Sequence, residues 1–190
     1  MQHKMYYNLS TLSQMDIYLF KQGSYTKMYE KFGAHPMTHK GKKGVHFAVW
    51  APNAKSVCVR GDFNDYKIDA HPLQLRSDDS GIWEGFIEDI AIGLTYKYHI
   101  VSLFHNIVHE KSDPFAFYSE VAPKSASRIY ELDNYKWNDK KWMEKRYKNN
   151  ACDSPISVYE MHVGSWRRNP LEDNRYLTYK ELALELVPYL

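Results

Sequence analysis

Carboxylates are the side chains of this sequence that could act as general acids or bases. Asp78 and Asp79 are neighbours, as are Glu88 and Asp89, and Glu160 lies in an apolar run. Acid–base chemistry needs groups that converge on one bond. Adjacent residues of a strand point to opposite faces, so neither pair converges. We therefore predict turns or solvated edges at both pairs, a buried and internally paired Glu160, and no catalytic residue.

The possible metal ligands and nucleophiles are nine histidines and two cysteines. The histidines are scattered and show neither the H-E-x-x-H pattern nor the Cys/His spacing of a metal site. Cys58 and Cys152 form no C-x-x-C pair, and Cys58 falls in an apolar strand pattern that suits a small buried side chain. We predict no bound metal and no cofactor.

Aromatic residues are abundant, with 16 Tyr, 8 Phe and 5 Trp. Aromatic side chains favour strands and buried cores. Tyr and Trp also keep a polar edge, which suits a surface that stacks on sugars. Burial is favoured for any single ring, but both interpretations stay open.

Charge and hydropathy exclude several classes of protein. The 25 basic and 23 acidic residues give a net charge of +2, which indicates neither a nucleic-acid footprint nor a polybasic membrane patch. No apolar run approaches the roughly 20 residues that a membrane span requires. Residues 1–16 lack the apolar region of a secretory signal. We expect a soluble, cytoplasmic protein that binds neither nucleic acid nor membrane.

Period-two alternation begins at Gly44 and predicts short strands separated by turns. The expected strands cover residues 45–49, 56–60, 73–76, 82–87 and 95–103, with a further pair near 104–109 and a closing strand at 127–132. This spacing is typical of an antiparallel, immunoglobulin-like β-sandwich. We place the sandwich at 44–133, after an N-terminal arm at 1–43.

Residues 134–155 predict a linker with a short helix through Lys148, which Asn138 or Asp139 can cap. Asp153-Ser-Pro155 then breaks the chain. The linker separates the sandwich from a different architecture.

Residues 156–190 predict one strand–loop–helix unit. Ile156–Val163 is an apolar, β-branched run that suits a strand buried on both faces. Thr178-Tyr-Lys-Glu181 has the form of a capping box, and the helix after it carries leucines at helical spacing. A single βα unit needs a parallel partner strand, and we find none in the remaining sequence. We therefore expect a truncated chain.

The run Ile156–Arg168, I-S-V-Y-E-M-H-V-G-S-W-R-R, closely resembles the first barrel strand of the 1,4-α-glucan (glycogen) branching enzymes. Three further matches to that family follow the expected order. They are Tyr29–Pro36 at the start of the sandwich, Val45–Ala54 with Gly61–Asn64 inside it, and Leu177–Ala183 with Leu186–Tyr189 in the first barrel helix. The resemblance covers nearly everything from Asp16 onward.

The resemblance implies a β-sandwich followed by a (β/α)8 barrel. It also implies a reaction that cuts an α-1,4 glucan and transfers the cut chain to a 6-hydroxyl with retention of configuration. Retention needs two carboxyl groups about 5–5.5 Å apart, and in the family these come from later barrel strands whose motifs this sequence lacks. We therefore expect an amino-terminal fragment that is inactive without the missing barrel. Its partner would be an α-glucan such as glycogen or an amylose-like chain.

In related sandwiches that bind glucan, flat aromatic rings stack on sugars and polar groups fix the hydroxyls. The positions this implies here are Asn64, Tyr66, Trp83 and Lys97. Where the family often reads G-D-F-N-x-W, this sequence has the smaller ring of Tyr66, and Val101–Val108 lacks the aromatic D-G-x-W hairpin. Both departures weaken the expected affinity of the isolated sandwich. Packing of Trp83 within the sandwich stays open as the alternative.

Two other functions compete with the branching-enzyme hypothesis. A non-catalytic glucan-binding or regulatory module would need the sandwich but not the segment after Pro155. A related debranching or trehalose-releasing enzyme is disfavoured by the run Gly164–Arg168. Within that run, Arg167 and Arg168 would either reach the substrate or pair with acidic neighbours such as Glu172 and Asp173.

Overall fold

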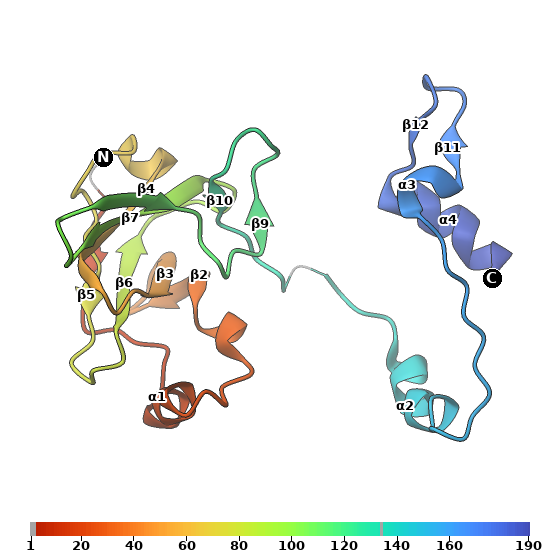
Figure 1. Cartoon of the computed structure of the whole chain (residues 1–190), viewed down its shortest axis with the longest axis horizontal. Coiled ribbons are helices and arrows are strands. Elements are labelled where there is room, and N and C mark those ends of the chain that lie inside the picture. Colours follow the sequence, from red (N-terminus) through yellow and green to blue (C-terminus); the bar gives the residue numbers. More distant parts are fainter. Residues whose placement is uncertain (1–2, 134) are drawn as a thin grey trace. The chain divides into compact units, whose positions relative to one another are not determined.

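The computed structural model describes residues 3–133 and 135–190, and the chain divides into two compact units, Met1–Lys136 and Trp137–Leu190. Each unit is described by itself. The first is a sandwich of two antiparallel β-sheets (Figure 1). The predicted mainly β, antiparallel sandwich is therefore confirmed.

The first sheet, sheet A, has the strand order β1-β6-β3-β2, with β5 also paired to β6. Its strands are β1 Met5–Tyr6, β2 Gly33–His39, β3 Lys42–Trp50, β5 Gln74–Leu75 and β6 Ile82–Glu88. Two of these strands come from the segment 1–43 that we predicted to be an arm. That segment is part of the sheet, so the structure starts the sandwich before residue 44.

The second sheet, sheet B, has the order β4-β7-β10-β9, with β8 also paired to β7. Its strands are β4 Ala54–Gly61, β7 Thr95–Ser102, β8 Val108–Lys111, β9 Tyr118–Ser119 and β10 Ser127–Arg128. Strand β7 is central, since β4 pairs along one edge and β8 and β10 pair along the other. The expected strand at 127–132 is formed only at its first two residues.

The core between the sheets follows the alternation of the strands. Val45, Phe47 and Val49 of β3 point inward against Tyr96 and Tyr98 of β7, and these five side chains are at most 5% exposed. Burying one such side chain stabilises the fold by about 1.5–3 kcal/mol relative to leaving it exposed. The inward face of each strand is thereby set by large apolar and aromatic residues.

A buried carboxylate lies at the end of this core. Asp113 Oδ2 accepts hydrogen bonds from the hydroxyls of Tyr96, at 2.7 Å, and Tyr98, at 3.0 Å. Asp113 Oδ1 accepts from the backbone N–H of Phe115, and the Asp113 N–H donates to Ser127 Oγ. Burial raises the pKa of Asp113. Both tyrosines therefore have partners for their buried hydroxyl groups, as buried polar groups require.

The outer side of sheet A is covered by helix α1, Gln14–Lys21, and the short helix η1, Met28–Glu30. Ser13 and Asp16 form a capping box that starts α1. A second apolar cluster joins this cover to the sheet, formed by Leu12, Ile17, Tyr25, Phe32 and Ile82. Strand β3 is consequently buried on both faces, which simple alternation had not indicated.

The second unit contains helices, one hairpin and extended segments. Its elements are α2 Lys140–Asn149, α3 Val163–Trp166, β11 Arg168–Asn169, β12 Arg175–Tyr176 and α4 Tyr179–Tyr189. The helix of the linker and the capping box of Thr178 and Glu181 are both confirmed. Throughout the described residues, no helix combines the length and the apolar character needed to cross a membrane.

The strand predicted at Ile156–Val163 is not formed in the structure of this chain. Residues 156–162 have no regular structure, and α3 begins at Val163. A strand of this type needs neighbouring strands to accept its hydrogen bonds, and none of the described strands pairs with this segment. Ile156 and Val158 are 82% and 83% exposed, and Glu160 is also exposed rather than buried. Of the predicted βα unit, the structure shows the helix alone.

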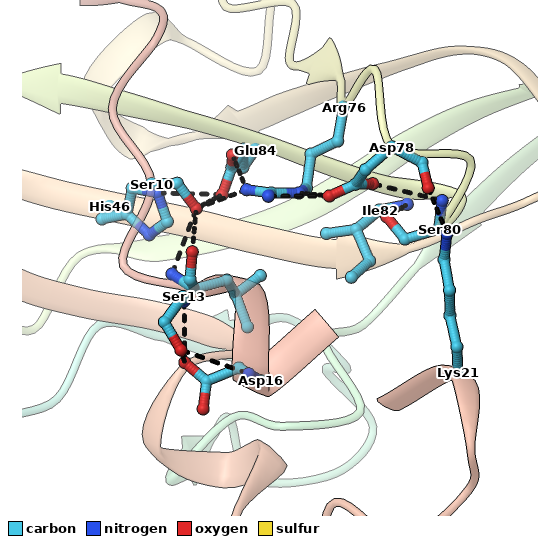
Figure 2. A network of polar contacts seen from close by, with 11 residues as sticks. Ser10, Ser13, Asp16, Lys21, His46, Arg76, Asp78, Ser80, Ile82 and Glu84 are labelled. Carbon is cyan, nitrogen blue, oxygen red and sulfur yellow. Dashed lines mark hydrogen bonds and ion pairs between the residues drawn. The ribbon is translucent and has the colours of Figure 1, made fainter. Parts of the chain in front are cut away.

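His46 shows what double-sided burial does to a titratable group (Figure 2). Its side chain is fully buried on β3, with Nε2 at 3.3 Å from the Leu9 carbonyl oxygen and 3.7 Å from a Glu84 oxygen. Among the described residues, Nδ1 has no hydrogen-bond partner. Burial lowers the pKa of His46 to about 4 from the usual 6.5, because the charged ring would lose its hydration.

We predict that His46 makes the fold sensitive to acid. A pKa that is lower in the folded state contributes stability above pH 6.5 and loses it as the pH falls toward 4, by up to about 3 kcal/mol. Urea unfolding at pH 7 and pH 4.5 should show this loss, and His46→Leu should reduce it. The exposed His109 serves as the control through His109→Leu. An equal pH dependence in wild type and His46→Leu would contradict the prediction.

Candidate functional site

The outer face of sheet B carries a group of polar and aromatic side chains. Because Tyr96 and Tyr98 point inward, Thr95, Lys97 and His99 of β7 must point outward. We name this surface the Tyr66–Lys97 face. Its members are Arg60, Tyr66, Thr95, Lys97, His99, Glu110, Tyr118 and Arg128.

Tyr66 is held on this face through its phenol hydroxyl and its backbone carbonyl. Asp65 and Tyr66 have positive φ angles of 51° and 53°, so the chain turns sharply after η2, Asp62–Asn64. The Tyr66 hydroxyl lies 2.6 Å from Thr95 Oγ1, and Arg60 Nε donates to the Tyr66 carbonyl oxygen at 2.5 Å. Burial raises the pKa of the Tyr66 phenol. The ring is therefore neutral at physiological pH and fixed in orientation.

Asn64 lies beneath this turn and is only 8% exposed. Its Nδ2 donates to the Val59 carbonyl oxygen at 3.0 Å and lies 2.8 Å from His71 Nδ1, while Oδ1 accepts from the Gly61 N–H. The amide is thus engaged within the fold. Asn64 positions the loop that carries Tyr66 and does not lie on the surface.

Trp83 lies on the other sheet, on β6. It is 7% exposed, belongs to the core between the sheets, and its Nε1 donates to the Ala51 carbonyl oxygen at 3.0 Å. The structure therefore does not place Trp83 with Tyr66 and Lys97. It fits the alternative that we left open, packing within the sandwich.

Lys97 lies near the centre of the face. Its ammonium donates to Ser125 Oγ at 2.8 Å, and its Cα is paired across the sheet with that of Arg60. Arg60 forms an ion pair with Glu110, whose Oε1 also lies 2.6 Å from His99 Nδ1. Donors and acceptors thus alternate beside the flat ring of Tyr66. This combination suits a neutral ligand that has both hydroxyl groups and C–H faces.

Sequence reasoning missed several members of this face. Tyr118 is 50% exposed, and the guanidinium carbon of Arg128 lies 5.8 Å from the centre of its ring. Arg128 is paired across the sheet with both Thr95 and Tyr118. Strand β9 is two residues long, which is too short for a period-two signal. Arg60 was accessible to prediction, because it alternates with buried residues on β4.

Two of the carboxylates considered for acid–base chemistry, Asp78 and Glu88, have structural partners. Asp78 accepts hydrogen bonds from Arg76 and from the Ser80 N–H, and Glu88 pairs with Lys42. Burial raises the pKa of the Cys58 thiol to about 11, so it stays protonated at neutral pH. Within residues 3–133 and 135–190, no three His, Cys, Asp or Glu side chains form a group that could hold a metal.

In the second unit, Arg167 and Arg168 have partners other than the two acidic neighbours that we named, and their contact with substrate stays a prediction. Arg167 pairs with Glu185 at 3.0 Å, and Arg168 lies over the ring of Tyr176 at 4.2 Å. Glu172 is instead paired with Arg175. Neither arginine uses the acidic neighbours that we named.

Known proteins resemble this chain along most of its length. Residues 31–116 match the family Carbohydrate-binding module 48 (Isoamylase N-terminal domain). The chain is 49% identical over 180 residues to the 1,4-alpha-glucan branching enzyme GlgB of Aquifex aeolicus, covering 95% of this chain and 28% of that protein. It is 46% identical over 181 residues to GlgB of Gloeobacter violaceus, covering 95% and 25%.

By sequence, the chain is similar to 1,4-α-glucan branching enzymes along 95% of its length. It spans about a quarter of the length of these curated relatives. A putative alpha amylase from Salmonella typhimurium has the same fold over 72% of this chain and 20% of its own, with a TM-score of 0.50 and 20% identity. The branching-enzyme resemblance read from the four motifs is therefore confirmed.

The burial of Trp83 leads to a stability prediction. Trp83→Ala should destabilise the first unit by about 3–5 kcal/mol, because it removes a large buried ring and leaves a cavity. Trp142→Ala, at a tryptophan that is 57% exposed in the second unit, should change stability by less than about 0.5 kcal/mol. Thermal unfolding of both variants checks this. A Trp83→Ala protein as stable as wild type would show that the ring is not part of the core.

Proposed function

We propose that this chain contributes the glucan-binding sandwich, and the beginning of the catalytic barrel, to a 1,4-α-glucan branching enzyme. The complete enzyme would form α-1,6 branches in glycogen by retaining transfer of an α-1,4 chain. The observation that carries the proposal is 46–49% identity to named branching enzymes along 95% of this chain. The proposed location is the cytoplasm, where glycogen would be the substrate.

The proposed site of glucan contact is the Tyr66–Lys97 face. Tyr66 supplies a neutral ring for stacking, while Lys97 and the Arg60–Glu110 pair supply hydrogen bonds to hydroxyls. The face lies largely within the residues that match the carbohydrate-binding family. Its rings are tyrosines, which offer less stacking area than tryptophan. We therefore expect weak binding by the isolated chain.

The proposed role of residues 156–190 is the first βα unit of the barrel. The support is the I-S-V-Y-E-M-H-V-G-S-W-R-R run and the capped helix α4. The apolar side chains of Ile156, Val158 and Leu184 are strongly exposed and would need neighbouring strands and helices to bury them.

A second candidate function is a glucan-binding module that acts without chemistry. The observation that favours it is the self-contained sandwich, whose core lies within residues 1–136. Both functions would use the same binding face. They differ only in whether the chain acts together with a catalytic barrel.

We predict that the Tyr66–Lys97 face carries glucan binding. In native gels that contain glycogen, wild-type chain should migrate more slowly, and Tyr66→Ala or Lys97→Ala should weaken binding roughly tenfold, or about 1.4 kcal/mol. Tyr147→Ala and Lys43→Ala change exposed residues elsewhere and serve as matched controls. If retardation occurs but all four variants behave alike, the ligand binds another surface.

We also predict that the 190-residue chain has no branching activity on amylose, since it spans only about a quarter of the length of the branching enzymes that it matches. The fall in absorbance of the amylose–iodine complex measures branching. A catalytically active relative serves as the positive control. A clear absorbance decrease, measured with chain that is free of contaminating enzyme, would refute the proposal that catalysis requires the rest of the barrel.

A further inference from the structure

We propose that a second carbohydrate contact lies on the outer side of sheet A, in an aromatic pocket built around Trp50. It would take one or two glucosyl units of an α-1,4 glucan chain. The identity of the ligand rests on the proposed function, but the pocket is separate from the Tyr66–Lys97 face. Trp50 shares the outer side of β3 with His46, whereas Tyr66 and Lys97 lie on the outer side of sheet B.

The pocket has the size and lining of a small-molecule site. Its volume is about 460 Å³, within the usual range of about 300–1,000 Å³ for ligand pockets. Aromatic side chains make most of its wall, with two polar groups at the rim. The residues used here are Phe20, Phe32, Trp50, Phe115, Lys21 and Ser80. Such sites combine apolar walls with a few placed polar groups.

Trp50 is exposed and held in one orientation. Its side chain is 55% exposed, although the six residues before it on β3 are buried. The indole Nε1 donates to the Ser80 carbonyl oxygen at 3.1 Å, and the Phe20 ring packs edge-on with its centre 5.9 Å away. Because the N–H already has a partner, the exposed ring offers chiefly its apolar surface to a ligand.

The turn that presents Ser80 is rigid (Figure 2). Asp79 and Gly81 have positive φ angles of 54° and 74°. A Cβ on Gly81 would lie 2.7 Å from Pro52 Cβ, so a larger residue does not fit there without movement. Asp78 accepts from the Ser80 N–H at 3.2 Å, while Arg76 Nε donates to Asp78 at 2.8 Å. The Trp50 platform is therefore formed before any ligand arrives, which reduces the entropy cost of binding.

The charge at the rim indicates the class of ligand. Lys21 donates to the Asp78 carbonyl oxygen, which brings an ammonium group to the mouth of the pocket. A purely aliphatic ligand would offer the Lys21 ammonium no hydrogen-bond acceptor. A glucosyl ring has an apolar C–H face for Trp50 and hydroxyls for Lys21.

Fluorine NMR of the whole chain tests the proposal. Labelling with 5-fluorotryptophan gives one signal for each of the five tryptophans, and Trp50→Phe assigns the signal of Trp50. Titration with maltoheptaose should move the Trp50 signal to saturation, in wild type and in Tyr66→Ala alike. Lys21→Ala should weaken this response about fivefold. The signal of the similarly exposed Trp142 serves as the control.

Three results would overturn the proposal. The Trp50 signal stays still with maltoheptaose, it moves only with the apolar probe 1-anilinonaphthalene-8-sulfonate, or its shift disappears in Tyr66→Ala. Unchanged gel retardation in Tyr66→Ala, together with a persistent Trp50 shift, would instead contradict the Tyr66–Lys97 face alone. A thermal unfolding curve for each variant confirms that it is folded.

Discussion

The buried carboxylate of Asp113 determines which side of β7 faces outward from the sandwich. Two tyrosine hydroxyls in a core need acceptors, and a single Asp113 oxygen serves both Tyr96 and Tyr98. Leaving one such hydroxyl unpaired would cost about 1–3 kcal/mol. The arrangement therefore locks the register of β7 against the segment that carries Asp113. Once these tyrosines point inward, the two-residue period sends Lys97 and His99 outward.

The same segment ties the two sheets together. The Asp113 N–H bonds to Ser127 on β10, and the Phe115 ring packs against Phe32 in the cluster outside sheet A. Asp113 thus connects strand β7 and its neighbour β10, and the adjacent Phe115 reaches the apolar cover of sheet A. A protein that binds a long, flexible glucan gains from such stiffness, because a preorganised surface loses less conformational entropy on binding.

Sequence patterns predicted the parts of the fold that local rules control. The alternation of Val45, Phe47 and Val49 indicated β3, and the spacing of Thr178 and Glu181 indicated the start of α4. The cover on sheet A was not predictable, because His46 is buried by residues that lie more than 30 positions earlier. The strand predicted at Ile156–Val163 did not form, because its pattern requires neighbouring strands that the described residues do not supply. Of four candidate sugar contacts, Tyr66 and Lys97 lie together, since burial of Asn64 and Trp83 depends on contacts that the family motifs do not specify.

The central claim is that the outer face of sheet B binds α-glucan. The most direct measurement is a map of backbone amide shifts in the ¹⁵N-labelled chain during titration with maltoheptaose. The account predicts saturable shifts along β4, β7 and β9, around Arg60, Lys97 and Tyr118, which Tyr66→Ala abolishes. Unchanged amides on these strands at ligand concentrations that shift other parts of the chain would contradict it.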